Sequence, residues 1–175
     1  MTDYQLLLLR HAKSSWRQAD LEDHQRPLNK RGLAAAKRMG LYLAEAGLRP
    51  DRVLCSTALR TRETWALAAE AMGEPAPPLA LLDDLYHAYP ADMLACIRRH
   101  GGEARRLLVL GHNPGMEHLA EQLAGPGSDP ASLEEMQEKY PTSGLAVFAC
   151  SLGAWEELTT AATRLLDFVT PAKLG

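Results

Sequence analysis

Two short apolar runs, far apart in this sequence, each lead directly into a histidine. Four leucines at residues 6–9 are followed by Arg10 and His11, and the run 106–111 is followed by His112. Apolar runs of this length predict strands that are buried on both faces, as in the parallel sheets of α/β proteins. Open α/β sheets bind their ligands at the carboxyl ends of such strands. We therefore expect Arg10, His11 and His112 to meet at one edge of a sheet.

Short apolar segments alternate with helical patterns along the rest of the chain, which predicts an α/β fold with a mostly parallel sheet. A length of 175 residues fits one domain, 1–175. Asn29 is expected to cap the first helix, and Ser56 or Thr57 the second. The other expected elements are strands at 51–56, 79–82, 144–150 and 164–169, helices ending near Gly47 and Met72, helices over 90–100 and after His112, a loop at 125–141 with one helical turn at 133–138, and an end of the ordered part at Pro171.

Composition excludes several classes of protein. The formal charge of −3 disfavours general nucleic-acid binding, which needs a basic surface. Cys55, Cys96 and Cys150 are far apart and odd in number, and Cys55 and Cys150 fall in apolar runs, which is typical of buried thiols in a reducing compartment. The first apolar run is too short for a signal peptide or a membrane span. We expect a cytoplasmic protein with no nucleic-acid or membrane partner.

Arg60 stands where a cation is unfavourable, in the first turn of the helix expected after residue 56. The helix dipole favours anions at that end, so an arginine there breaks a local rule, as functional residues often do. A surface ion pair with Glu63 or Glu70 is the ordinary alternative. If Arg60 is functional, it joins Arg10 at the sheet edge, and two guanidinium groups are well suited to hold a phosphate or carboxylate.

Histidine in an arginine-lined site can attack phosphorus as a nucleophile, or it can stabilise the phosphoryl group during transfer. The sequence contains no Walker A loop and no G-x-G-x-x-G after a strand, so a nucleotide site has little support. It also contains no H-x-H or H-E-x-x-H spacing, and arginine beside a ligand histidine is unhelpful to a cation. We expect no metal and no cofactor.

Six short motifs of this chain, in order along its length, resemble those of the histidine phosphatase (phosphoglycerate mutase-like) superfamily, and the whole chain is similar to its small SixA-type phosphohistidine phosphatase branch. A lone Arg-His would be a weak sign, whereas the ordered set is specific. The motifs are Leu9-Arg10-His11-Ala12-Lys13-Ser14, Asp23-x-x-Arg26-Pro27-Leu28-x-x-Arg31-Gly32, Ser56-x-x-x-Arg60-x-x-x-Thr64, Leu85-Tyr86-x-Ala88, Gly111-His112-Asn113-Pro114-Gly115 and Tyr140-Pro141-Thr142-Ser143-Gly144.

The resemblance implies a three-layer α/β/α sandwich and a phosphatase in which His11 becomes phosphorylated. It implies that Arg10, Arg60 and His112 complete the phosphate pocket. Larger members carry a glutamate three residues before a tyrosine as general acid, and Asp83 stands at that spacing before Tyr86. A solvated loop carboxylate is the alternative for Asp83.

Other residues are weaker candidates. Ser14, Arg26 and Asn113 are expected to contact the substrate phosphate or to flank it. Ala12 replaces the glycine that the family usually has after the histidine, and we expect this to alter substrate fit and not the nucleophile.

Three functions fit these residues. The leading one is hydrolysis of a protein phosphohistidine through a covalent intermediate on His11. A small-molecule phosphatase acting on a sugar phosphate or nucleotide is the second, although a compact chain with short insertions favours an open site that suits a protein surface. A phosphate-binding module without catalysis is the third. The partner expected in every case is a phosphate-bearing molecule.

Overall fold

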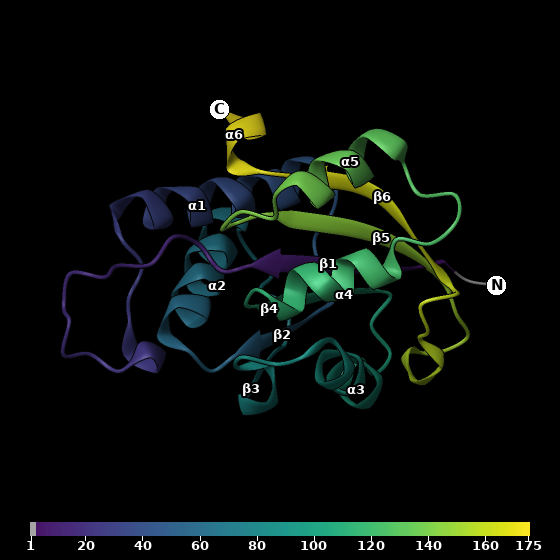
Figure 1. The fold of residues 1–175 in the computed structure, drawn as a ribbon, viewed down its shortest axis with the longest axis horizontal. Coiled ribbons are helices and arrows are strands. Elements are labelled where there is room, and N and C mark those ends of the chain that lie inside the picture. Colours follow the sequence, from purple (N-terminus) through teal and green to yellow (C-terminus); the bar gives the residue numbers. More distant parts are fainter. Residues whose placement is uncertain (1–2) are drawn as a thin grey trace.

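A computed structural model describes residues 3–175, which form one six-stranded sheet flanked by helices (Figure 1). The strand order is β3-β2-β4-β1-β5-β6. Strands β1 to β4 pair in parallel, and β5 pairs antiparallel with both β1 and β6. The predicted α/β fold with a mostly parallel sheet is therefore confirmed. The elements are β1 (Asp3–Arg10), α1 (Lys30–Glu45), β2 (Arg52–Ser56), α2 (Leu59–Met72), β3 (Leu79–Leu82), α3 (Pro90–His100), β4 (Arg106–Gly111), α4 (Gly115–Leu123), α5 (Pro130–Glu138), β5 (Leu145–Ser151), β6 (Thr163–Val169), α6 (Pro171–Leu174) and three short 3₁₀ helices at Asp23–Gln25, Asp83–Leu85 and Trp155–Glu157.

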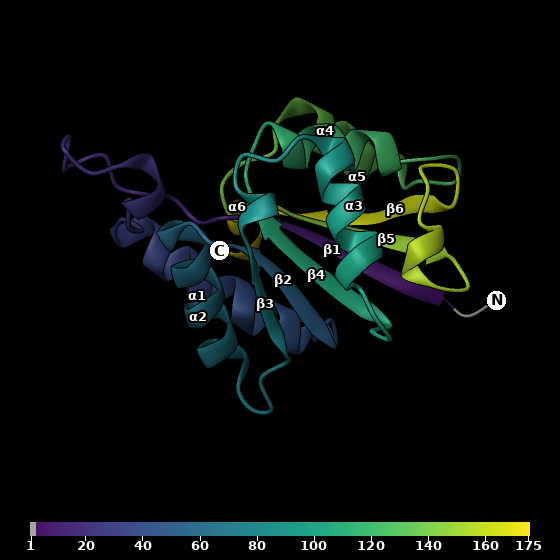
Figure 2. The same ribbon diagram turned by 90° about the horizontal axis from the view of Figure 1, so that it is seen from below.

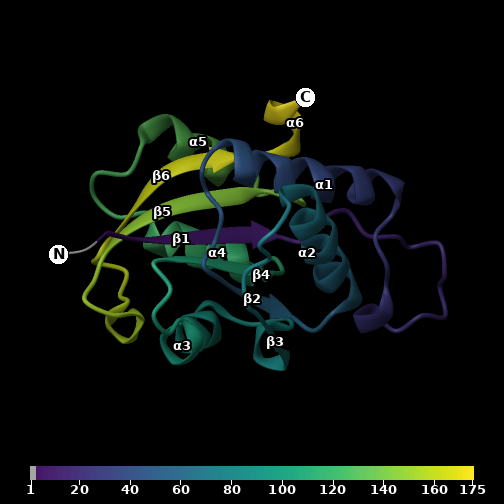
Figure 3. The same ribbon diagram turned by 180° about the vertical axis from the view of Figure 1, so that it is seen from behind.

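Strand β1 shows why the sheet has a helical layer on each face. Its leucines are all fully buried, and they alternate between two apolar cores. Leu7 and Leu9 pack in the core under α1 and α2, whereas Leu6 and Leu8 pack in the core under α3 and α4. Figures 2 and 3 show α1 and α2 covering one face of the sheet, with α3 and α4 on the other. Because both faces are covered, a continuous apolar run can form this central strand.

Three local predictions need correction. Helix α2 begins at Leu59 with Ala58 before it, and neither Ser56 nor Thr57 makes a side-chain cap. The loop after α4 holds the nine-residue helix α5 instead of a single turn, capped by Asp129 with Pro130 in its first turn. The chain beyond Pro171 is ordered, since Pro171 begins α6 and that helix packs on α1. The prediction that Asn29 caps α1 is confirmed, because its side chain accepts from the amide of Gly32 at 2.9 Å.

The segment between β1 and α1 folds back on itself beyond the carboxyl ends of the strands (Figure 1). Two backbone hydrogen bonds join its two arms. The amide of Ser15 donates to the carbonyl of Pro27 at 2.8 Å, and the amide of Asn29 donates to the carbonyl of Lys13 at 2.9 Å. We call residues 13–28 the β1–α1 loop. It lies beside the sheet edge at which the two histidines were expected.

Candidate active site

His11 lies at the end of β1, between β4 and the turn that leads into β5. Its ring is almost fully buried, and its Nδ1 lies 2.7 Å from the carbonyl oxygen of Ala12. Since a carbonyl can only accept, Nδ1 carries the proton and Nε2 keeps a free lone pair. The pKa of His11 is lowered to about 4, chiefly by burial and also by the charges of Arg60 and Arg10, against the opposing effect of the Ala12 carbonyl. The imidazole is therefore neutral at pH 7, as a nucleophile must be.

His112 follows β4 and lies beside His11, with 5.3 Å between the ring centroids. The register of β1 with β4, in which Arg10 pairs with Gly111, sets this proximity. His112 Nε2 lies 2.8 Å from the hydroxyl of Ser56 at the end of β2, and its buried Nδ1 has no partner among the described residues. Burial lowers the pKa of His112 to about 2, and the neighbouring His11 and Arg60 contribute in the same direction.

Arg60, in the first turn of α2, is buried, and no ion pair joins it to Glu63 or Glu70 among the described residues. Its guanidinium donates to the backbone carbonyl and the carboxylate of Asp23, at 2.7 and 3.0 Å. Its Nε has no partner among the described residues. Because its charge lowers the pKa of both histidines, Arg60 belongs to the same cluster.

Arg10 and Asn113 are held by one carbonyl. Arg10 Nη1 donates to the carbonyl of Tyr140 at 2.9 Å, and the amide of Asn113 donates to the same oxygen at 3.1 Å. The buried Nε of Arg10 has no partner among the described residues, as is true of Arg60 and of His112 Nδ1. The four expected residues Arg10, His11, Arg60 and His112 thus lie together, with several buried donors left for a ligand.

Asp23 is the residue that sequence reasoning missed. Its carboxylate accepts from Arg60, Tyr86, His87 and Arg26, at 3.0, 2.6, 3.0 and 3.1 Å. Burial would raise the pKa of Asp23, but the hydrogen bonds from Tyr86, Arg60 and His87 outweigh it and hold the pKa well below its usual range. The motif that contains Asp23 and Arg26 was visible, but no spacing in the sequence links Asp23 to Arg60.

The predicted general acid, Asp83, lies in the short 3₁₀ helix that follows β3. Its carboxylate accepts from the hydroxyl of Thr57 at 2.6 Å, and that hydroxyl in turn lies 3.0 Å from His24. No described hydrogen bond joins Asp83 to His11 or His112, so its acid role stays a prediction.

Ser14 and Arg26, predicted to bind substrate, contact each other. Arg26 donates to the Ser14 hydroxyl at 2.8 Å and to Asp23 at 3.1 Å, and its guanidinium stacks on Trp16 at 3.4 Å from the ring centroid. Both side chains are buried, so in this structure they brace the β1–α1 loop. Their contact with substrate stays a prediction. The charge of Arg26 also lowers the pKa of His11.

Ala12 does not crowd the cluster. Its side chain is fully buried in a small apolar group with Leu28 and Ala36, and its amide donates to the hydroxyl of Thr64 at 3.0 Å. The methyl group that replaces the family's glycine therefore packs between the β1–α1 loop and α1.

Among residues 3–175, no group of three or more His, Cys, Asp or Glu side chains is placed so that it could hold a metal ion. Within the same range, no helix has the length and apolar character needed to cross a membrane. The three cysteines are buried and unpaired, as expected for Cys55 and Cys150.

Comparison with known proteins agrees with this geometry. An uncharacterized protein of Mycobacterium tuberculosis is 38% identical over 93% of this chain and 99% of its own length. Two crystal structures assigned to the SixA phosphohistidine phosphatases share the fold: one from Agrobacterium tumefaciens is 31% identical, with 96% of this chain and 98% of that one covered and a TM-score of 0.79. The other, from Nakamurella multipartitia, is 29% identical, with 98% of each chain covered and a TM-score of 0.82.

A family model locates the similarity in the sequence. The description of the matching family is Histidine phosphatase superfamily (branch 1), and its match spans residues 6–88. That span contains the segments that carry Arg10, His11, Asp23 and Arg60, and full-length relatives extend the likeness through His112. This chain belongs to branch 1 of the histidine phosphatase superfamily.

Proposed function

We propose that this protein is a metal-independent phosphohistidine phosphatase that forms a covalent phosphohistidine on His11. The observation that carries the proposal is the state of the His11 ring: Nδ1 is held by the Ala12 carbonyl, and the neutral Nε2 is left with a free lone pair beside His112. A nucleophile of this kind needs no separate base, because its attacking nitrogen carries no proton.

The reaction follows in two displacements. His11 Nε2 forms a bond to the substrate phosphorus while the phosphorus–nitrogen bond of the substrate phosphohistidine breaks, and the leaving imidazole takes up a proton. Water then attacks the phosphorus of phospho-His11, which releases inorganic phosphate and restores the free ring. Arg10, Arg60 and His112 stabilise the charge on the transferring group, and the unpartnered nitrogens of these three residues are suited to donate to its oxygens.

The fixed ring of His112 supports this role. Its Nε2 lies 2.8 Å from the Ser56 hydroxyl, which also receives the amide of Ala58 at 3.3 Å. If the hydroxyl donates to Nε2, the proton of the neutral His112 ring lies on Nδ1, the nitrogen that has no protein partner. A neutral imidazole with Nδ1–H can donate to a phosphoryl oxygen without a charge of its own.

A protein substrate is supported by two exposed aromatic side chains on the segments that flank the cluster. Trp16, on the β1–α1 loop, and Tyr89, two residues after His87, are each 75% exposed. Asp23 joins the two segments. Its carboxylate accepts hydrogen bonds from His87 and from Arg26, and the guanidinium of Arg26 stacks on Trp16. Exposed aromatic residues are favoured contact residues at protein interfaces.

The decisive experiment labels the nucleophile. Wild-type protein is mixed with a phosphohistidine peptide that carries radiolabelled phosphate, quenched in alkali, and digested to find the labelled residue. We expect the label on His11, loss of at least about 10³-fold of turnover in His11→Ala, and slower hydrolysis of phosphoserine and sugar phosphates than of phosphohistidine. His100→Ala, at the far end of α3, is the matched control and should retain turnover.

Three results would decide against this function. Wild-type turnover in His11→Ala would exclude the covalent step on that residue. Preference for a sugar phosphate or nucleotide would favour a small-molecule phosphatase. Tight phosphate binding without turnover of any substrate would favour a binding module.

A further inference from the structure

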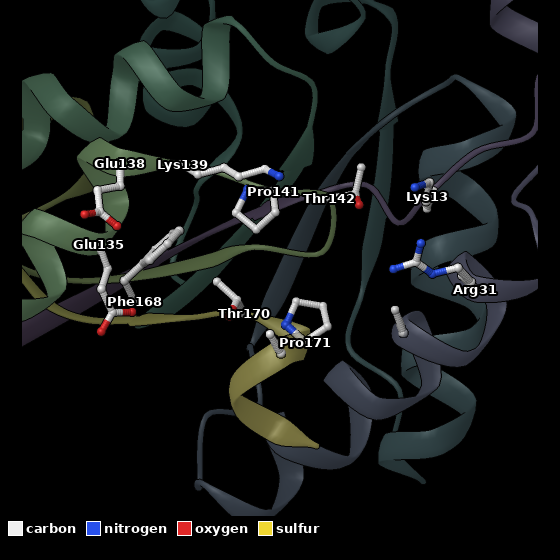
Figure 4. Close-up of a pocket in the computed structure, with 12 residues that line it drawn as sticks. Lys13, Arg31, Glu135, Glu138, Lys139, Pro141, Thr142, Phe168, Thr170 and Pro171 are labelled. Atoms are coloured by element: carbon white, nitrogen blue, oxygen red, sulfur yellow. The ribbon is translucent and has the colours of Figure 1, made fainter.

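A cavity beside the histidine cluster takes no part in the chemistry described above. Its volume is about 570 Å³, and it lies between α1, α5 and α6 (Figure 4). This is within the size range of ligand-binding sites in proteins. Phe168, Pro141 and Pro171 supply apolar surface, and Thr142 and Thr170 line the space between them. We call it the α1–α5 cavity.

Three cations without acidic partners line this cavity. They are Lys13 from the β1–α1 loop, Arg31 from α1 and Lys139 from the end of α5. All three are exposed, and none of them forms an ion pair within residues 3–175. Figure 4 shows the Arg31 guanidinium directed across the cavity toward Thr142. In a chain of net charge −3, three unpaired cations around one hollow mark a place that attracts anions.

The acidic residues of the cavity lie at the end away from Lys13 and Arg31. Glu135 is neutralised by Lys173 at 2.6 Å, and Glu138 lies next to it on α5 (Figure 4). The potential is therefore most positive at the end formed by Lys13 and Arg31.

That positive end is connected to the nucleophile through the backbone. Lys13 follows His11 by two residues. Thr142 precedes Ser143, whose amide donates to the carbonyls of Arg10 and His11, at 3.1 and 3.0 Å. The cationic end of the cavity and His11 are therefore carried by adjoining stretches of backbone, which allows one extended ligand to contact both.

We propose that the α1–α5 cavity binds an acidic, extended segment of the protein substrate that lies next to the phosphorylated histidine. This inference rests on the proposed function and names the kind of substrate protein that fits it. The unpaired cations complement carboxylates of the segment, and the Phe168–Pro141–Pro171 surface contacts its apolar parts. The cavity then contributes to substrate affinity and leaves the rate of the chemical step unchanged.

The kinetic test compares two phosphohistidine peptides that differ only in acidic or neutral residues flanking the histidine. Arg31→Glu/Lys139→Glu should raise KM for the acidic peptide about 10-fold or more and leave kcat within about twofold. The reversed charges repel the acidic peptide and so weaken its binding, but they do not touch the reacting atoms. Hydrolysis of phosphoramidate, which is too small to reach the cavity, should change less than about twofold. Lys37→Glu/Arg164→Glu makes the same change in net charge at exposed positions outside the cavity and should match wild type.

A binding test keeps this inference separate from the proposed function. A fluorescent acidic peptide without phosphate is titrated by anisotropy at low salt, where electrostatic attraction is least screened. We expect wild type and Lys37→Glu/Arg164→Glu to bind it, and Arg31→Glu/Lys139→Glu to lose at least about 10-fold of that affinity.

Each outcome is informative. If wild type fails to hydrolyse phosphohistidine but binds the acidic peptide through Arg31 and Lys139, the function is wrong and the cavity still binds acidic segments. Equal binding of acidic and neutral peptides by wild type would overturn the cavity proposal, as would unchanged affinity in Arg31→Glu/Lys139→Glu.

Discussion

At the scale of single residues, position within the fold determines what each charged group does. Arg60 lies in a helix turn that disfavours cations, and a carboxylate far away in sequence, Asp23, compensates at 3.0 Å. His11 and His112 are buried in the neutral form, and this burial also affects stability. The proposed chemistry and the pH dependence of folding therefore depend on the same two residues.

The lowered pKa values of His11 and His112 predict that the protein loses stability in mild acid. Their pKa values are about 4 and about 2 in the folded protein, against about 6.5 in the unfolded chain. Between pH 6.5 and 4 the unfolded chain binds protons that the folded protein does not, so the free energy of unfolding falls as pH falls. The slope is about 1 kcal/mol per pH unit for each histidine between pH 6 and 5.

Urea unfolding at pH 7, 6 and 5 measures that slope, and His11→Ala/His112→Ala should flatten it. Asp23 does not obscure the measurement, since the stability from its lowered pKa is present above about pH 4 and is lost only below it. An equal slope in wild type and the double variant would show that the two rings are protonated in the folded protein at pH 5.

At the scale of elements, close backbone contacts determine how the loops meet at the cluster. Gly115 begins α4, and a Cβ at this position would lie 2.0 Å from the carbonyl oxygen of Ala88. Only glycine allows α4 to approach the segment that carries Tyr86 and His87. That approach places both rings next to His112, with centroid distances of 5.5 and 5.6 Å.

Gly115→Ala should therefore damage both folding and activity. The added methyl must displace backbone, so we expect the free energy of unfolding to fall by about 1–3 kcal/mol. The Tyr86–His87 segment should move away from His112, and kcat should fall with it. Gly153→Ala is the matched control, since its Cβ would meet only the flexible carboxylate end of Glu157. Chemical unfolding and turnover of both variants measure the difference, and full activity in Gly115→Ala would show that the segment is not positioned by this contact.

At the scale of the whole molecule, the cluster joins elements that are distant in sequence. Arg10 ends β1 and His11 follows it, Arg60 lies in α2, and His112 follows β4. Asp23 joins the β1–α1 loop to Arg60. A ligand held by all of these at once binds only the folded protein. Phosphate binding and global stability are therefore linked.

Inorganic phosphate should raise the thermal midpoint of unfolding. At a concentration of 100 times Kd the stabilisation is about 2.7 kcal/mol, which corresponds to roughly 5–10 °C for a chain of this size. Arg60→Met should lose most of this shift, and Arg164→Met, an exposed arginine on β6, should keep it. Differential scanning calorimetry with and without phosphate makes the measurement, and an equal shift in both variants would place the phosphate elsewhere.

Local patterns in the sequence are enough to predict the sheet and the meeting of Arg10, His11 and His112 at its edge. Burial periodicity is a local property, so the runs before His11 and His112 were sufficient to predict two buried parallel strands, and parallel strands must end at one edge. The family resemblance, drawn from motifs in these same segments, is confirmed. Helix α5 is longer than the single turn that the sequence predicts, because its cap at Asp129 and Pro130 lies in a stretch whose composition is typical of a loop.

Only the tertiary structure decided which polar side chains meet. Asp23 accepts from Arg60, Tyr86 and His87, because the β1–α1 loop folds back over the sheet edge. Ser14 and Arg26 contact each other for the same reason. The α1–α5 cavity likewise forms between helices that are distant in the chain. Such contacts depend on where loops and helices come to rest in space, and no local pattern of apolar residues encodes that.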